Sequence, residues 1–203
     1  MKKAATYLAA HDKVLAPVIA EVGLCNIRPH QNYYKELVES IIGQQLSIKA
    51  AAAIEARFVG LFEGQFPAAK QLLTTDVETL RGIGFSYAKG RYVLDLAQHI
   101  VDGKVKFDHL DGLSNEEIVA ELTAVKGIGE WTAHMFLMFC MGRLDVLPTG
   151  DLGIRNGIAK LYGLKKVPSP EQITRIAKKN HWQPYQSVAS WYVWQSPKNE
   201  SAI

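Results

Sequence analysis

Apolar residues recur at helical spacing along almost the whole chain, and strand-like alternation is hard to find. Turn residues separate stretches of helical length, so we expect about ten helices with short connections. Several starts carry a serine or aspartate, whose side chain can accept a bond from a free amide of the first turn. The predicted helices cover residues 12–21, 33–42, 47–61, 86–103, 131–141 and 151–162, with capping boxes at 114–117 and 169–172. The pattern predicts an all-α fold.

The composition is that of an ordinary folded domain, and the net charge limits the kinds of partner that the chain is expected to bind. The chain has 203 residues, 48% hydrophobic and 21% charged, which is enough for one sizeable core or two small lobes. Its net charge of +3 permits a polyanionic partner without requiring one. Any contact with nucleic acid should therefore be confined to a patch.

The two cysteines and the N-terminus exclude several classes. Cys25 and Cys140 lie in apolar segments, which favours reduced core thiols over a disulfide, and two thiolates cannot hold an iron–sulfur cluster. The apolar stretch after Lys2 and Lys3 is broken at residues 11–13, so it is no secretory signal, and no run is long enough to span a bilayer. We expect no membrane contact, and a location in the cytoplasm near the nucleoid of a bacterium or in the nucleus of a eukaryote.

A glycine hairpin lies between two of the predicted helices. In KGIGEWTA, residues 126–133, Gly127 and Gly129 permit positive φ and the close approach of another backbone. The amides that open the following helix form an anion site, which a DNA phosphate would fit. A single Gly-x-Gly usually marks only a helix end and a turn, as in the partial copy at residues 80–85. The hairpin at residues 126–133 differs from that copy, because a Gly/Pro loop and an aspartate follow it along the chain.

An aspartate comes after the hairpin and a tight loop. Pro148 and Gly150 make the loop, and Asp151 then opens a helix, where an N-cap contributes about 1 kcal/mol. A fixed carboxylate at such a place can also stabilise the positive charge that builds on a sugar as its glycosidic bond breaks, and it can orient water. Asp145, before the proline, is the nearest rival and is typical of an ordinary loop acid.

A Gly-x-Gly hairpin, a Gly/Pro loop and an aspartate in this order resemble the helix-hairpin-helix (HhH-GPD) superfamily of DNA glycosylases. Three more motifs agree in order: SIIGQQLSIKAAA at 40–52, GFSYAKG at 84–90 and WQPYQSVASWYVW at 182–194. The last is similar to the C-terminal helix of the 3-methyladenine DNA glycosylase II branch, although Gln186 stands where that branch usually has arginine. The resemblance covers roughly residues 33–194, and the short chain resembles the compact, yeast-like form.

The resemblance implies two helical lobes with a cleft between them. The central lobe would comprise residues 33–145, including the hairpin segment 120–135, and the second lobe would combine 1–32 with 146–203. Asp151 would be the catalytic carboxylate, and the base pocket would contain Trp131, Met135 and Trp194. Aromatic faces suit a cationic base, although core packing is the plain alternative for each tryptophan.

The resemblance also implies a DNA-binding surface. Gln45, or else Leu46, would be the wedge that fills the gap left by a flipped base, and the plain alternative is a capped helix with solvated glutamines. The full predicted set is Gln44, Gln45, Leu46, Ser47, Lys49, Ser86, Lys89, Gly127, Gly129 and Thr132. Backbone carbonyls of Thr123, Val125 and Ile128 would hold a structural Na⁺ or K⁺, while catalysis would need no cofactor.

The implied function is monofunctional excision of alkylated purines, of the 3-methyladenine and 7-methylguanine type, from damaged double-stranded DNA in base excision repair. The enzyme would act as a monomer and leave an abasic site. Bifunctional relatives carry a lysine nucleophile where Trp131 stands, and an indole cannot form a Schiff base. The alternatives are a bifunctional glycosylase/lyase for oxidised bases, a non-catalytic helix-hairpin-helix DNA-binding protein, and a helical scaffold.

Overall fold

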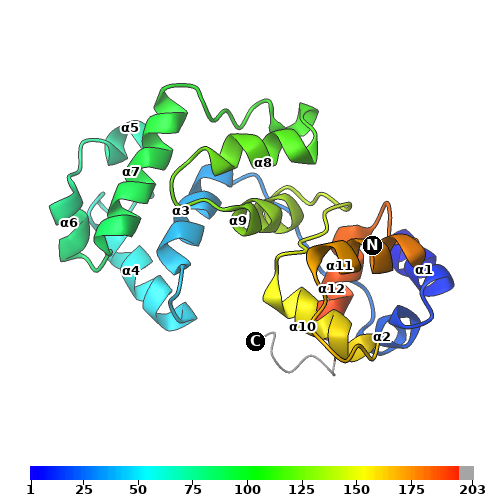
Figure 1. The fold of residues 1–203 in the computed structure, drawn as a ribbon. Coiled ribbons are helices and arrows are strands. Elements are labelled where there is room, and N and C mark those ends of the chain that lie inside the picture. The colour runs from blue at the N-terminus through cyan, green and yellow to red at the C-terminus, as the bar shows by residue number, and fades with distance from the viewer. Residues whose placement is uncertain (197–203) are drawn as a thin grey trace. The chain divides into compact units, whose positions relative to one another are not determined.

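The computed structural model describes residues 1–196, and this range is helical without any strand (Figure 1). The α-helices are α1 Lys2–His11, α2 Leu15–Val22, α3 Tyr33–Gly43, α4 Ile48–Gly60, α5 Ala69–Leu72, α6 Val77–Gly82, α7 Tyr87–Val101, α8 Asn115–Thr123, α9 Glu130–Met135, α10 Leu152–Leu161, α11 Pro170–Lys179 and α12 Gln186–Gln195. A 3-10 turn lies at Leu110–Gly112 and a π-helical turn at Phe136–Cys140. The predicted all-α fold is confirmed. No helix in the described range has the length and apolar character needed to cross a membrane.

Five of the described helices, α4, α7, α8, α10 and α11, begin at predicted caps, whereas the predicted helix 12–21 begins only at Leu15 because Asp12 is the C-cap of α1. The hydroxyl of Ser47 accepts from the amide of Ala50, and Ser114 and Ser169 form reciprocal capping boxes. The predicted helix 131–141 differs, because α-helical bonding ends at Met135 and the chain continues as the π-helical turn. That turn is apolar at every position, so periodicity cannot distinguish α from π geometry there.

One compact unit comprises Gln31–Phe136. Within it α7 contacts α3, α5 and α6, while α3 also packs on α4, and α8 on α9. Fully buried apolar side chains from these helices form its core, among them Leu37, Ile41, Phe58, Leu80 and Leu96. This unit carries both the hairpin and the turn between α3 and α4.

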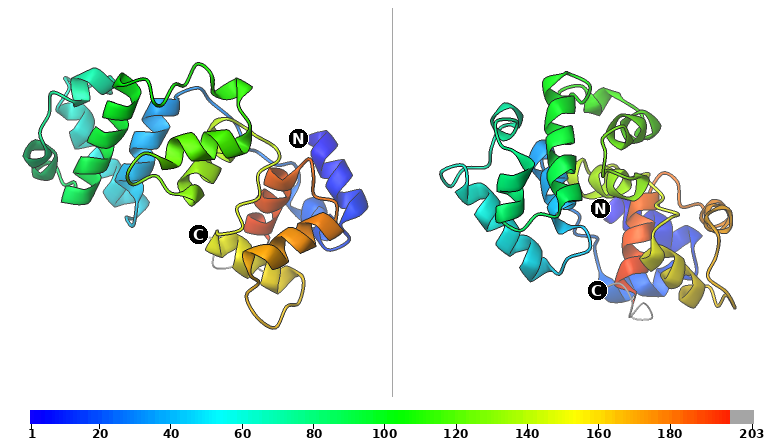
Figure 2. Two further views of the ribbon diagram at one scale, coloured as in Figure 1. Left: turned by 45° about the horizontal axis from the view of Figure 1, so that its top comes forward. Right: turned by 60° about the vertical axis from the view of Figure 1, so that its left-hand side comes forward.

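The other unit joins Met1–His30 with the described part of Leu137–Ile203. Here α12 contacts α1, α2 and α10 (Figure 2), and its residues 187–193 are all buried. A helix surrounded in this way needs apolar or small residues on every side, so it shows no amphipathic stripe. The unit boundaries fall after residues 30 and 136, whereas the sequence predicts them after 32 and 145.

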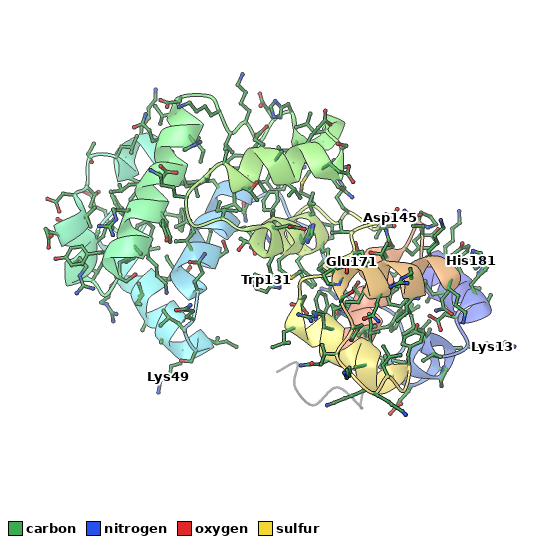
Figure 3. The ribbon with its side chains drawn as sticks, in the orientation of Figure 1. Lys13, Lys49, Trp131, Asp145, Glu171 and His181 are labelled. Carbon is green, nitrogen blue, oxygen red and sulfur yellow. The ribbon has the colours of Figure 1, made fainter. Side chains whose placement is uncertain are left out.

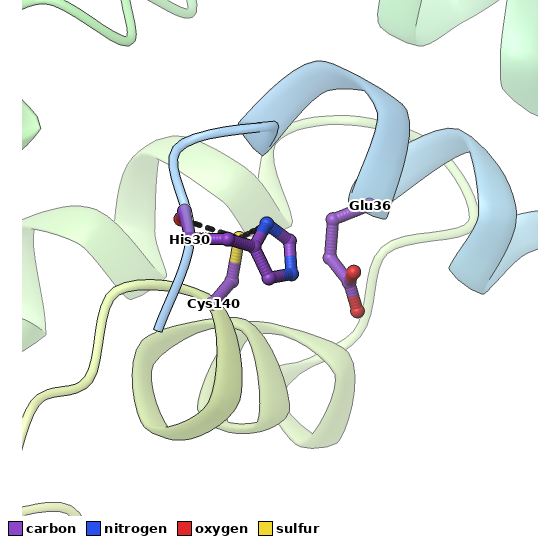
Figure 4. A group of neighbouring side chains, drawn as sticks. All are labelled: His30, Glu36 and Cys140. Carbon is purple, nitrogen blue, oxygen red and sulfur yellow. Dashed lines mark hydrogen bonds between the residues drawn. The ribbon is translucent and has the colours of Figure 1, made fainter. Parts of the chain in front are cut away.

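Within this second unit, the N-terminal segment is fixed to the π-helical turn at His30 and Cys140 (Figure 4). The His30 amide donates to the Cys140 carbonyl at 2.9 Å, and the Cys140 sulfur lies 3.7 Å from both Nδ1 and the carbonyl oxygen of His30. Both cysteines are buried thiols outside any disulfide, as predicted, and burial raises the pKa of the Cys25 thiol.

Candidate functional site

The glycine hairpin connects α8 to α9 and is fixed to the middle of α7. The amide of Lys126 donates to Asp95 Oδ2 at 2.9 Å, and Gly127 adopts φ +88° against the ring of Tyr92. Gly129 is the N-cap of α9 and has no side chain to accept from the amides of the first turn. Free amides at a helix start favour an anion, so this geometry suits a phosphate, and the phosphate contact itself stays a prediction.

Replacing Gly127 by alanine is expected to destabilise the protein by about 2 kcal/mol, because it combines backbone strain with a steric clash. The new Cβ would lie 2.2 Å from Cδ2 of Tyr92, at a φ that side chains other than glycine rarely adopt. Thermal unfolding measures the loss. Gly129→Ala is the matched control, because its φ is −94° and its Cβ would meet nothing within 4 Å. Equal melting temperatures for the two variants would contradict this account.

The carbonyls predicted to hold a monovalent cation lie on both sides of this bend. Thr123 ends α8, where helix carbonyls lack intrahelical partners, and the Val125 carbonyl also accepts from the Ile128 amide at 3.1 Å. Neutral carbonyl oxygens at the negative end of a helix suit Na⁺ or K⁺ chemically. The ion stays a prediction.

The turn between α3 and α4, residues 44–47, carries the predicted wedge. Gln45 is exposed and has a φ of +56°, which is unusual for a residue with a side chain. Leu46 is 39% exposed, and Ile48, which was not among the predicted contacts, is 90% exposed. Lys49 projects outward from the first turn of α4 (Figure 3). A β-branched apolar residue directly after the Ser47 cap is the signal that could have identified Ile48.

Two residues predicted to contact DNA bond to this turn and to the hairpin. Gln44 Nε2 donates to the carbonyl of Gly127 at 2.7 Å, and Lys89 Nζ donates to the carbonyls of Ile42 and Gln44 at 2.8 and 2.6 Å. Ser86 caps α7 through the amide of Lys89. Contacts of these residues with DNA stay predictions.

A cavity of about 350 Å³ lies between α3 and α9. Trp131, Thr132 and Met135 line it from α9, so the structure brings two predicted pocket residues together. Trp131 lies on the first turn of α9 (Figure 3) and is 53% exposed, whereas Thr132 is buried. From α3 the lining residues include Glu36 and Ser40, which were not predicted although they are polar and share a helix face at i, i+4 spacing. The volume falls in the range of small-ligand sites.

Asp151 lies in the other unit, as the N-cap of α10. Its Oδ1 accepts from the amide of Ile154 at 2.7 Å and from the indole nitrogen of Trp194 at 2.9 Å. A Cβ on Gly153 would come within 3.0 Å of that indole nitrogen, so this glycine permits the approach of Trp194. The predicted cap is confirmed, and the carboxylate is half-buried in a fixed orientation. A grouping of Trp194 with Trp131 stays a prediction.

The rival acid, Asp145, has a different environment. Its carboxylate accepts from the side-chain amides of Gln186 at 2.9 Å and of Gln183 at 3.4 Å. Gln186, at the position where the resemblance implies an arginine, therefore forms a neutral bond to this acid where an arginine would supply a charge. Asp145 connects the loop before α10 to the segment that begins α12.

An acidic pair on α3 and α4 makes stability depend on pH. Lys35 Nζ lies 3.3 Å from Glu39 and 3.8 Å from Glu55, yet burial and the neighbouring Glu55 raise the pKa of Glu39 to about 7. The folded state then holds a proton that the unfolded state releases at a lower pH. Stability conferred by that proton is present at acidic pH and is lost as the pH rises towards 7.

Glu39→Gln is expected to stabilise the protein by about 1 kcal/mol at pH 8, after allowance for solvent screening, and to have little effect at pH 4. The neutral amide keeps a hydrogen-bonding group without the repulsion from Glu55. Melting temperatures across this pH range measure the difference. Glu21→Gln, at an exposed position in α2, is the control and should leave the profile unchanged. A constant difference between Glu39→Gln and the unsubstituted protein at all pH values would refute this explanation.

Comparison with known proteins shows which family this chain matches. Residues 38–183 match the family described as "HhH-GPD superfamily base excision DNA repair protein". "DNA-3-methyladenine glycosylase 1" of Schizosaccharomyces pombe is 35% identical over 98% of this chain and 88% of its own, and "Alkylbase DNA glycosidase-like protein mag2" of the same organism is 31% identical over 97% and 94%.

Solved structures agree. The S. pombe 3-methyladenine DNA glycosylase Mag1 in complex with abasic DNA superposes with a TM-score of 0.80 at 35% identity, over 95% of each chain. A DNA-3-methyladenine glycosidase from Bacillus halodurans gives 0.85 at 38% identity, over 95% of this chain and 88% of that one. The chain belongs to the HhH-GPD superfamily of base excision DNA repair proteins.

Proposed function

We propose that this protein is a monofunctional DNA glycosylase that flips alkylated purines out of duplex DNA and excises them, leaving an abasic site. The observation that carries the proposal is the Asp151 carboxylate, oriented by a helix amide and by Trp194 in a chain of this superfamily. The names of the two S. pombe relatives point to alkylated bases as the substrate class.

The chemistry depends on the charge that develops in the reaction. As the N-glycosidic bond lengthens, the sugar gains oxocarbenium character, which a fixed carboxylate stabilises. Asp151 would supply that charge and orient the attacking water. An N3- or N7-alkylated purine is already cationic, so it leaves without protonation by the enzyme. Trp131, exposed beside the cavity, offers an aromatic face to such a cation.

Damaged double-stranded DNA is the proposed partner, and the protein is proposed to bind it as a monomer. The hairpin would hold a phosphate through backbone amides while the turn at 44–47 enters the helix at the extruded base. Mag1, which matches 95% of this chain, is solved on abasic DNA. The hairpin and the turn belong to unit Gln31–Phe136, whereas Asp151 belongs to the other unit.

Absence of lyase activity is expected from the side chain at position 131. An indole has no nucleophilic amine, so no Schiff base can form with the sugar. Borohydride treatment of the protein with lesion-containing DNA is therefore expected to trap no covalent adduct, and the product strand should stay intact until it is treated with alkali. An adduct would favour the bifunctional alternative.

The direct test is chromatography of the bases that purified protein releases from methylated DNA. We expect 3-methyladenine and 7-methylguanine in the supernatant. DNA binding without release of either base would favour the non-catalytic alternative. Met135 lines the pocket without an aromatic ring that could stack on a flat base, so ethenoadenine is expected to be a poorer substrate than 3-methyladenine.

A further inference from the structure

Lys89 is half-buried, and its ammonium group bonds to the protein's own backbone. It lies in the first turn of α7, and its ammonium donates to the carbonyls of Ile42 and Gln44, where α3 ends. A cation at the C-terminal end of a helix is favourable, because the unpaired carbonyls carry negative partial charge. Partial burial lowers the pKa of Lys89. The positive charge of Lys89 thus interacts with carbonyls of the protein itself.

Gln44 joins the turn between α3 and α4 to the hairpin. Lys89 holds the backbone of Gln44, and the side chain of Gln44 reaches across to the carbonyl of Gly127. The backbone at Gln45 then enters the left-handed region, which costs about 1 kcal/mol for a residue with a side chain. That conformation persists only where its surroundings impose it. The bonds to Gln44 are the neighbouring restraint.

One face of α7 supports both elements. Lys89, Tyr92 and Asp95 succeed one another at three-residue spacing, which places them along one side of the helix. Lys89 bonds to the turn, Tyr92 packs against Gly127, and Asp95 accepts from the amide of Lys126. The wedge turn and the hairpin therefore share a single rigid support.

We propose that Lys89 is a positioning residue that fixes the wedge turn, residues 44–47, at a set distance from the phosphate-binding hairpin. The inference rests on the proposed function, because it concerns extrusion of the target base. Correct placement of the wedge matters most where the base is firmly paired, since extrusion costs least for a mismatched base. Loss of Lys89 should therefore slow excision from a stable pair far more than excision from a mismatch.

The test compares single-turnover excision of 7-methylguanine opposite cytosine with excision opposite adenine. We expect Lys89→Met to lower the rate opposite cytosine about tenfold, and the rate opposite adenine by about twofold or less. Lys89→Arg, which keeps donors and charge, should recover most of the loss. A 2-aminopurine next to the lesion should show less extrusion with Lys89→Met at saturating protein.

Lys49→Met is the matched control, because it also removes a charge near the turn but makes none of these bonds. It should weaken binding and slow both substrates equally. Equal losses on both substrates for Lys89→Met, or an unchanged rate, would overturn the proposal.

If Lys89→Met is unfolded at the assay temperature, Gln44→Met cuts the bond to Gly127 and must show the same selective loss. No excision by the unsubstituted protein would instead refute the proposed glycosylase activity.

Discussion

Asp151→Asn is expected to lower base excision by roughly 10²–10³-fold while leaving the fold and the binding of abasic DNA intact. Oδ1 of the side chain accepts from the Ile154 amide and the Trp194 indole. Asparagine keeps an oxygen for both bonds and is itself a good N-cap, so the substitution removes charge and little else. The negative charge is what an oxocarbenium-like transition state requires.

Single-turnover excision of 7-methylguanine and binding to abasic duplex are the two measurements. Asp145→Asn is the matched control, because Asp145 is a carboxylate of the same unit that bonds to Gln186 and Gln183. It should leave the rate within about threefold of the unsubstituted protein, as for a substitution outside the reacting groups. A large loss for Asp145→Asn with a small one for Asp151→Asn would move the catalytic role to the rival acid.

The sequence was sufficient for features that depend on a residue and its near neighbours. The caps at Ser47 and Asp151 arise from side chains that reach amides three residues ahead. Gly127 was expected to allow positive φ, and it does. The motif order then indicated the superfamily, which the family match at residues 38–183 confirms.

Features that depend on distant contacts could not be predicted. Lys89 and Gln44 have the polar character of DNA-contacting residues, and only folding shows that they bond to carbonyls 45 and 83 residues away along the chain. The bond between Asp151 and Trp194 likewise spans 43 residues. Glu36 lines a cavity only because α3 and α9 come together. Helical periodicity assigns a face to each residue but does not identify the helix that meets that face.

The unit that joins Met1–His30 with the described part of Leu137–Ile203 depends for its stability on a buried aspartate, Asp12. The sequence suggested this residue only as a helix cap. Asp12 is fully buried between α1 and α2, where its Oδ1 accepts from the amides of Val14 and Leu15. Its Oδ2 accepts from the Trp182 indole at 2.7 Å and from the Tyr162 hydroxyl. Burial and the adjacent Asp12 charge hold the pKa of Tyr162 well above its usual range. One carboxylate thus joins the N-terminal helices to the segments after α10 and α11.

Asp12→Ala is expected to destabilise the protein by about 3 kcal/mol or more, because four donors lose a fully buried acceptor. For a chain of this length that corresponds to a melting temperature lower by roughly 6–12 °C. Tyr162→Phe is the control: it removes one donor and leaves the carboxylate three partners, so its loss should be about 1 kcal/mol. Asp12→Asn should fall between the two, since its amide group would face the Trp182 N–H. Melting curves that rank Tyr162→Phe as the most damaging change would show that burial of the tyrosine, and not the shared carboxylate, holds these segments together.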